Sequence, residues 1–195
     1  MKGIIFVCLL FLSIGNAHSQ EIEWLTWEEV SEKMHEEPRK VVVDVYTEWC
    51  GWCKKMDAST FKNPEVVNYI NENFYAIKFD AEYKKSIYLN GKEYKFIKSG
   101  RKGYHELAAK ILRGKLSYPS LVFLDQNMKV IQPIPGYRDA NTFHMIMNYF
   151  DGDHHKKVLW KTYANNFEKQ KKSSDDSPEK SPNGVPVRVV TSKGN

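Results

Sequence analysis

An apolar, β-branched stretch that runs directly into a pair of cysteines constrains this chain more than any other feature. Residues 40–46 read KVVVDVY, a pattern typical of a strand that is buried on both faces. Residues 54–73 then have the pattern of a helix, with a possible bend at Asn63, where the following proline allows a fresh helical start. Cys50 and Cys53 are therefore expected between a buried strand and the start of a helix.

The rest of the chain predicts an α/β fold in which helices and strands alternate. Strands that are joined through helices favour parallel pairing, whereas two strands joined by a tight turn must be antiparallel. These connections predict one mixed central sheet flanked by helices. We expect helices over residues 26–37, 104–112 and 139–150 and within 155–169, further strands over 74–81, 120–125 and 129–134, and a β-hairpin around Asn90-Gly91.

The first residues, 1–19, have the pattern of a secretory signal peptide. Lys2 precedes an apolar run over residues 4–14, and small residues follow, so we place cleavage after Ser19. The run is shorter than the roughly 20 residues that a membrane-spanning helix needs. We expect a periplasmic protein, if the source is bacterial, or a secreted one, with no stable membrane insertion after cleavage. Cleavage would also remove Cys8 and leave a single cysteine pair.

The remaining chain divides into a folded domain over residues 20–169 and a tail over 170–195 that is rich in Ser, Asp, Lys and Pro. Such a composition buries too little apolar surface to offset its ordering entropy, so we expect the tail to be disordered. The alternative is that its VPVRVV segment pairs with an edge strand. The charges of the tail are mixed in sign and the net charge of the chain is only +5, which argues against a nucleic-acid partner.

The position of the cysteine pair at a helix start favours redox chemistry. Unpaired N–H groups and the helix dipole stabilise a thiolate there and lower the pKa of the first cysteine. Two intervening residues keep the sulfurs within disulfide reach. We expect Cys50 to be the exposed nucleophile and Cys53, one turn into the helix, to be the shielded thiol that resolves a mixed disulfide.

Other interpretations of the pair have less support. A zinc site needs further ligands at suitable spacing, and the sequence has neither a second cysteine pair nor histidines at such a spacing. Haem attachment needs a histidine after the second cysteine, where Lys54 stands. A purely structural disulfide stays open, although so small a loop removes little chain entropy. We expect no metal and no cofactor.

Several residues around the pair point to a known family. Trp49 precedes the first cysteine, and Asp44 stands six residues before it. Tyr118 and Pro119 lead into an apolar strand, and Gly136 precedes a predicted helix. With these residues the chain resembles the thioredoxin-like superfamily, and its WCGWC motif is similar to that of secreted thioredoxin-related proteins. The resemblance implies a thioredoxin fold with a β-hairpin insertion.

The resemblance also implies roles for individual residues. Asp44, in an apolar strand, should have a raised pKa and accept the proton from Cys53 during the resolving step. Thioredoxins place a lysine beside this aspartate, and Lys78 matches it by strand register. Pro119, if its peptide bond is cis, offers no N–H, and the backbone of Tyr118 can then pair with a substrate chain.

The resemblance covers residues 23–150, and the sequence departs from thioredoxin in three places. Gly51 and Trp52 replace the usual Gly-Pro between the cysteines, so a thioredoxin reduction potential does not transfer. Tyr118 is larger than the residue usual before the proline, which puts partner choice in doubt. Residues 82–103 are an insertion that forms either a recognition edge or a plain surface hairpin.

We therefore expect a thiol–disulfide oxidoreductase that exchanges its cysteine pair with thiols or disulfides of protein substrates, and we favour reduction. An unidentified redox partner would restore the pair. Three alternatives stay open: a disulfide oxidase or isomerase, a non-catalytic thioredoxin-fold binding module with an aromatic contact surface, and a thiol peroxidase acting on small oxidants. The residues expected to contact substrate are Trp49, Gly51, Trp52, Tyr118 and Pro119.

Overall fold

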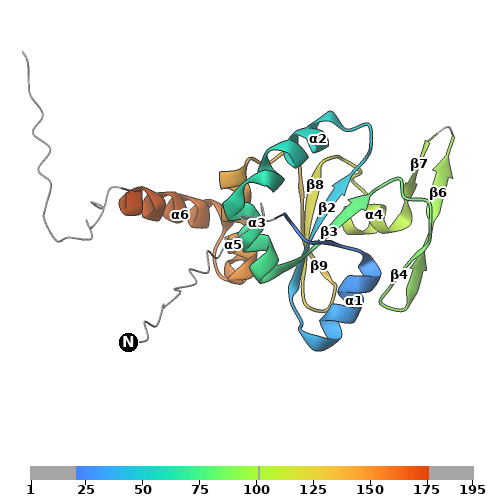
Figure 1. The fold of residues 1–195 in the computed structure, drawn as a ribbon, viewed down its shortest axis with the longest axis horizontal. Coiled ribbons are helices and arrows are strands. Elements are labelled where there is room, and N and C mark those ends of the chain that lie inside the picture. Colours follow the sequence, from blue (N-terminus) through green and yellow to red (C-terminus); the bar gives the residue numbers. More distant parts are fainter. Residues whose placement is uncertain (1–20, 101, 176–195) are drawn as a thin grey trace, which may run out of the picture.

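A computed structural model describes residues 21–100 and 102–175 of the chain. The expected signal peptide and the VPVRVV segment lie outside these residues. A five-stranded sheet forms the centre, with helices on both of its faces (Figure 1). In chain order the elements are β1 (Trp24–Leu25), α1 (Trp27–Glu36), β2 (Lys40–Tyr46), α2 (Gly51–Ala58), η1 (Thr60–Lys62), α3 (Pro64–Asn73), β3 (Phe74–Asp80), β4 (Ile87–Leu89), β5 (Lys92–Tyr94), β6 (Phe96–Ser99), β7 (Lys102–His105), α4 (Glu106–Ile111), β8 (Ser120–Leu124), β9 (Val130–Pro135), α5 (Ala140–Asp151), η2 (His154–Lys156) and α6 (Trp160–Asp175).

The sheet is mixed, and β2 lies at its centre. The strand order is β1-β3-β2-β8-β9. β2 pairs in parallel with β3 and antiparallel with β8, while β9 runs antiparallel to β8 at the edge. This confirms the predicted mixed sheet. β1, which pairs in parallel with β3, was not predicted because its two residues are too few to show a strand pattern.

The alternation of side chains along β2 decides which residues face the cysteine-bearing helix. Val41, Val43 and Val45 pack in the apolar cluster that includes α1 and α4. Val42 belongs to the cluster on the other face, which α2, α3 and α5 cover. Asp44 alternates with Val43 and Val45, so its carboxyl lies on the same face as α2.

The single helix predicted over residues 54–73 is wrong, since α2, η1 and α3 replace it. The possible bend at Asn63 is a complete break. The Asn63 side chain accepts hydrogen bonds from the backbone N–H groups of Glu65 and Val66, and Pro64 is the first residue of α3. Because an N-cap residue has an extended backbone, the chain must leave the helical conformation there.

The insertion holds two hairpins rather than the single one predicted. β4 and β5 form the predicted hairpin around Asn90 and Gly91, which both have positive φ. β6 and β7 form the second one. Tyr104 belongs to β7 and not to the predicted helix, because the His105 side chain caps α4 and makes Glu106 its first residue. Figure 1 shows the hairpins at the opposite end of the molecule from α6.

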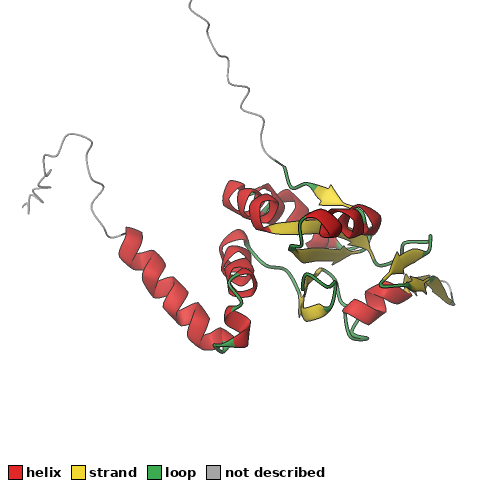
Figure 2. Cartoon of the chain, turned by 90° about the horizontal axis from the view of Figure 1, so that it is seen from below, coloured by secondary structure: helices red, strands yellow, loops and turns green. Residues whose placement is uncertain are grey.

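The C-terminal region differs from the helix expected within residues 155–169. The short 3-10 helix η2 precedes α6, which continues to Asp175, so the beginning of the predicted tail is helical. α6 leads away from the sheet (Figure 2). Its first turn packs against α5, since the ring of Tyr149 lies 5.2 Å from that of Trp160 and 4.9 Å from that of Tyr163.

His105 is fully buried where the insertion meets α4. Its Nδ1 accepts a hydrogen bond from the Leu107 N–H at 3.1 Å, and its Nε2 lies 3.1 Å from the Lys85 carbonyl oxygen, to which it can donate. Nδ1 accepts only while it carries no proton, so this arrangement requires the neutral imidazole. Burial accordingly lowers the pKa of His105.

We predict that His105 makes the folded protein less stable in mild acid. The unfolded histidine takes up a proton below about pH 6.5, whereas the folded one resists protonation, so the free energy of unfolding falls as the pH drops through this range. In His105→Asn, whose amide can still cap the helix, this part of the pH dependence disappears. Urea unfolding between about pH 7.5 and 5 measures it, and equal pH slopes for both proteins would contradict the prediction.

Candidate functional site: a disulfide at a helix start

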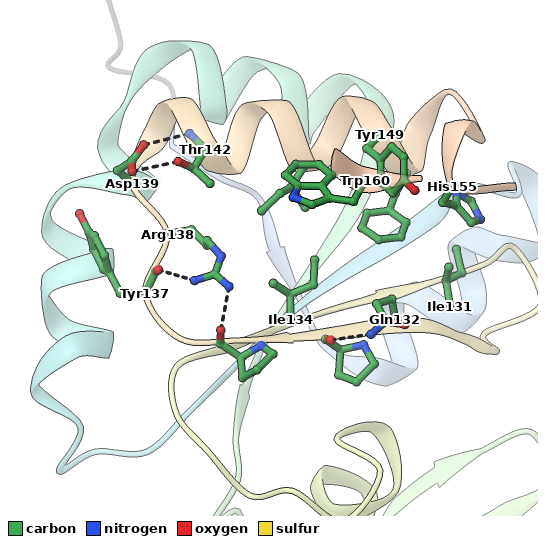
Figure 3. A pocket seen from close by; sticks show the side chains of 14 residues that line it. Ile131, Gln132, Ile134, Tyr137, Arg138, Asp139, Thr142, Tyr149, His155 and Trp160 are labelled. Atoms are coloured by element: carbon green, nitrogen blue, oxygen red, sulfur yellow. Dashed lines mark hydrogen bonds between the residues drawn. The ribbon is translucent and has the colours of Figure 1, made fainter. Parts of the chain in front are cut away.

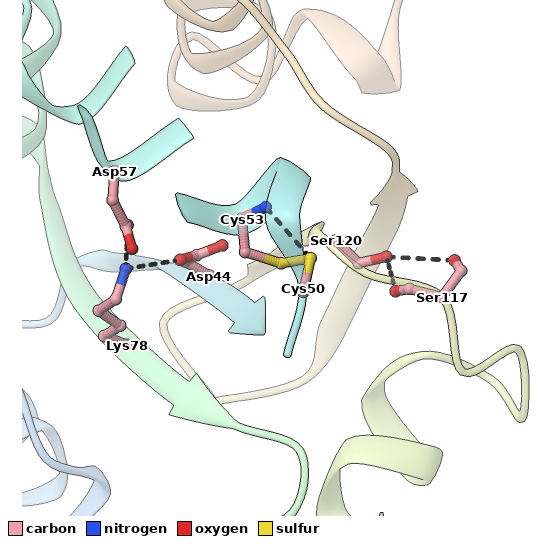
Figure 4. Close-up of a disulfide and its surroundings, with 7 residues drawn as sticks. All are labelled: Asp44, Cys50, Cys53, Asp57, Lys78, Ser117 and Ser120. Atoms are coloured by element: carbon pink, nitrogen blue, oxygen red, sulfur yellow. Dashed lines mark hydrogen bonds and ion pairs between the residues drawn. A yellow bond between two sulfur atoms is a disulfide. The ribbon is translucent and has the colours of Figure 1, made fainter. Parts of the chain in front are cut away.

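The two cysteines form a disulfide at the first turn of α2 (Figure 4). Their Cα atoms lie 5.3 Å apart. Cys50 is the N-cap of the helix, and its Sγ accepts a hydrogen bond from the Cys53 N–H at 3.1 Å. The positive end of the helix dipole therefore faces the Cys50 sulfur. After reduction, this position stabilises a Cys50 thiolate.

Cys50 is less accessible than the sequence predicts. The residue is only 5% exposed, so the expectation of an exposed nucleophile is wrong for the oxidised protein. The physical reason is that its sulfur turns inward to bond Cys53 and to accept the Cys53 N–H. The neighbouring tryptophans provide the exposed surface instead, since Trp49 is 61% and Trp52 57% exposed.

Aromatic side chains flank the disulfide on two sides. The ring of Trp49 lies 5.9 Å from that of Tyr118, and the ring of Trp52 lies 5.5 Å from that of Tyr137. The Lys55 ammonium lies over both Trp52 and Tyr137, at 4.7 Å and 5.2 Å from the ring centres. Sequence reasoning missed Tyr137 and Lys55. The position of Tyr137 directly after the glycine of the thioredoxin pattern is a signal that could have found it.

The insertion reaches the rim of this site through Trp49. The Trp49 Nε1–H donates a hydrogen bond to Glu82 Oε1 at 3.2 Å, and Glu82 is the first residue of the insertion. The Lys102 ammonium, from β7, lies 5.4 Å from the centre of the Trp49 ring. These contacts place both ends of the insertion at the rim of the site.

The peptide bond between Tyr118 and Pro119 is cis. This loop lies beside the disulfide, where the Ser120 hydroxyl donates to the Ser117 carbonyl oxygen at 2.7 Å (Figure 4). The Pro119 carbonyl oxygen accepts a hydrogen bond from the Gly136 N–H at 2.8 Å. The loop before β8 is thereby tied to the end of β9.

A buried carboxyl lies on the α2 face of the sheet and pairs with a lysine. Lys78 Nζ lies 3.1 Å from Asp44 Oδ2, which confirms the prediction that Lys78 lies beside Asp44. Lys78 also pairs with Asp57. The lysine therefore bridges two carboxylates. Asp57 was not predicted, although its position four residues after Cys53 on α2 places it on the same helix face.

Burial controls the protonation of Asp44. Removal of the carboxyl from water raises its pKa to about 6, against the opposing effect of the Lys78 charge. No described residue hydrogen-bonds to its Oδ1, and Figure 4 shows the carboxyl between Lys78 and the cysteines. A carboxyl with this pKa can accept a proton near neutral pH.

The site is built from thiol, carboxyl, lysine and aromatic side chains. Within residues 21–100 and 102–175, no three His, Cys, Asp or Glu side chains come together in a way that could hold a metal ion.

None of the helices in this part of the chain has both the length and the apolar character needed to cross a membrane.

Comparison with known protein families identifies the chain. The sequence profile of a thioredoxin-like domain matches residues 27–151. The chain belongs to this family. The match confirms the thioredoxin fold that the resemblance implies. It runs from the first residue of α1 to the last residue of α5 and leaves η2 and α6 outside.

Solved structures share the fold of this chain, and curated proteins share part of its sequence. A thioredoxin-fold protein from Helicobacter pylori has a TM-score of 0.51 at 18% identity, over 71% of this chain and 86% of that one. A thioredoxin from Thermus thermophilus has a TM-score of 0.50 at 17% identity, over 67% and 87%. Spermatogenesis-associated protein 20 of Rattus norvegicus is 29% identical over 75 residues, which are 38% of this chain but 9% of that protein. The chain thus corresponds to a small part of this relative.

We predict that Asp44→Asn stabilises the folded protein at neutral pH. The Asp44 carboxyl has a pKa of about 6 in the folded protein against a usual 3.8. Its contribution to the free energy of unfolding is therefore fully present below a pH of about 3.8 and is lost as the pH rises through about 6. Ionised at neutral pH, the buried carboxylate costs on the order of 3 kcal/mol, a cost that asparagine does not have. Urea unfolding measures the difference.

The matched control is Asp57→Asn, which removes the more exposed carboxylate of the same ion-pair group. We expect no comparable increase in the free energy of unfolding from Asp57→Asn. For Asp44→Asn the gain should shrink at about pH 4, where the folded wild-type carboxyl is already protonated. An equal gain at both pH values would show that desolvation of the charge is not the cause.

Proposed function

We propose that this protein is a thiol–disulfide oxidoreductase that reduces disulfides of protein substrates. The observation that carries the proposal is a cysteine pair at a helix start with a buried carboxyl of raised pKa below it. A disulfide kept only for stability gives no reason to bury Asp44, because the buried charge destabilises the fold. A proton acceptor that titrates near neutral pH is, by contrast, useful for thiol exchange.

In the first step, the reduced protein attacks a disulfide of the substrate. The Cys50 thiolate, stabilised by the helix start, bonds to one substrate sulfur and displaces the other, which leaves as a thiolate and takes up a proton. The product is a mixed disulfide between Cys50 and the substrate. The exposed pair of tryptophans beside Cys50 supports the binding of a polypeptide at this point.

In the second step, Cys53 resolves the mixed disulfide. Its thiol gives its proton to the Asp44 carboxylate, and its sulfur bonds to the Cys50 sulfur while the second substrate thiolate leaves. Two electrons have then passed from the cysteine pair to the substrate, and the protein holds the Cys50–Cys53 disulfide. Lys78 keeps the Asp44 carboxylate in place for this transfer.

The substrate chain would lie across the disulfide between the two tryptophans and the cis loop. Trp49 and Trp52 contact its side chains, and Gly51, at which an added Cβ would meet no atom within 4 Å, leaves room for its backbone. Pro119 offers no N–H, so the backbone of Tyr118 is the group that pairs with the substrate beside the sulfurs.

We infer that the protein works in the periplasm or outside the cell, on the basis of its N-terminal sequence. In such an oxidising compartment, turnover requires a partner that returns two electrons to the cysteine pair. The chemical class of that partner is a dithiol protein, which reduces the pair by the reverse of the exchange described above.

We predict that the protein catalyses reduction of insulin by dithiothreitol. Reduced insulin precipitates, so turbidity measures the rate. Cys50→Ser should lower the rate to the uncatalysed level, because no sulfur remains to attack the substrate. An inactive wild type, or a Cys50→Ser variant as active as the wild type, would overturn the proposed function.

The Cys53→Ser variant separates a catalyst from a binding module. Without the resolving thiol, the mixed disulfide on Cys50 should accumulate as a covalent adduct with insulin. Non-reducing electrophoresis detects this adduct, and dithiothreitol cleaves it by reducing the disulfide. The double variant Cys50→Ser/Cys53→Ser is the matched control and should form none. A non-catalytic module would give no adduct with either variant.

A further inference from the structure

A groove of about 870 Å³ lies between the edge strand β9 and helix α5, and the reaction described above makes no use of it (Figure 3). Its size is within the roughly 300–1,000 Å³ of ligand-binding clefts. Ile131 and Ile134 from β9 and Ile146 and Phe150 from α5 belong to its lining. These side chains can accommodate apolar groups. The lining also has polar members, which are Gln132, Arg138, Asp139, Thr142 and His155.

One residue of the groove lining contacts the helix that carries the disulfide. Tyr137 lines the groove, and its ring lies 5.5 Å from that of Trp52, the residue directly before Cys53. The Lys55 ammonium lies over both rings and holds them together. A chain bound at the disulfide can therefore continue past Trp52 and Tyr137 into the groove.

Two residues beyond the family match also line the groove. These are His155 and Trp160, and both follow residue 151, where the family match stops. The Trp160 ring packs on Tyr149 at 5.2 Å, and Figure 3 shows it between Arg138 on one side and His155 on the other. Residues that follow the family match thus form part of this groove.

The edge of β9 next to the groove is closed to strand addition at two positions. Pro133 and Pro135 have no N–H to donate. Their carbonyl oxygens already accept hydrogen bonds from the Gln132 amide at 3.1 Å and from the Arg138 guanidinium at 2.9 Å. An added strand would find neither donor nor acceptor free there. An occupant must therefore be held by its side chains.

We propose that this groove binds an apolar segment of the substrate polypeptide that lies a few residues from the cysteine that Cys50 attacks. The proposal rests on the proposed function and deepens it. The disulfide site selects the sulfur, and the groove selects substrates with apolar residues nearby. The contact between Trp52 and Tyr137 favours the substrate as the occupant, because a chain bound at the disulfide lies next to Trp52 and therefore near Tyr137 of the groove.

The test compares two synthetic peptides of equal length, each with one cysteine that carries a thionitrobenzoate leaving group. One peptide has leucines two to five residues from the cysteine on both sides, and the other has glycine and serine there. Reduced wild-type protein should react with the leucine peptide about tenfold faster at low peptide concentration, judged by release of the coloured thiol. Trp160→Ala should reduce this preference to less than about twofold.

Leu159→Ala is the matched control. Leu159 precedes Trp160, is 81% exposed and does not line the groove, so its loss should leave the peptide preference unchanged. Glutathione disulfide, which is too small to span the groove, should react equally with all three proteins. A leucine preference that persists in Trp160→Ala, or that the wild type lacks, would overturn the groove proposal. A wild type that reacts with none of these disulfides would instead overturn the proposed function.

A second measurement does not depend on the fold of the Trp160 variant. In the full-length Cys53→Ser protein, the mixed disulfide with the leucine peptide should shift the backbone amide resonances of Ile131, Gln132 and Ile134 and of residues 154–160, whereas the mixed disulfide with the glycine peptide should not. If residues 176–195 or a second copy of the chain filled the groove, neither peptide would shift these resonances, and the proposal would fail.

Discussion

The burial of β2 on both faces is the constraint on which the site depends. The strand has a neighbour on each edge and an apolar cluster on each face, with Val43 paired to Ile77 on one side and to Val122 on the other. Contacts on both edges and both faces therefore fix the position of the end of β2, and with it the start of α2. The same burial surrounds Asp44, so one strand both positions the cysteine pair and raises the pKa of the carboxyl below it.

Asp44 also shows which electrostatic effect dominates in the site. Lys78, at 3.1 Å, lowers the pKa of the carboxyl, yet burial raises it to about 6, so desolvation outweighs the ion pair. Lys78 cannot compensate fully because Asp57 shares its charge. The domain therefore keeps a carboxyl whose charge destabilises the fold at neutral pH but which can accept a proton there.

Local patterns were enough to predict the parts of the fold that a few neighbouring residues determine. The β-branched run predicts β2 over residues 40–46 as observed, the helix expected from residue 26 begins at its cap Thr26, and the Asn90 turn forms its hairpin. The features that were missed depend on contacts that no local pattern shows. The low exposure of Cys50 belongs to the disulfide-bonded state, and the position of Tyr137 beside the site depends on its contact with a tryptophan that is distant in sequence.

The reduction potential of the Cys50–Cys53 pair tests the proposed direction of electron flow most directly. The protein would be equilibrated in thiol–disulfide buffers of known potential and followed by the fluorescence of Trp49 and Trp52, which flank the pair. The account predicts a two-electron couple near about −270 mV, the range of a dithiol reductant. A value near or above about −120 mV, typical of a disulfide oxidant, would contradict it.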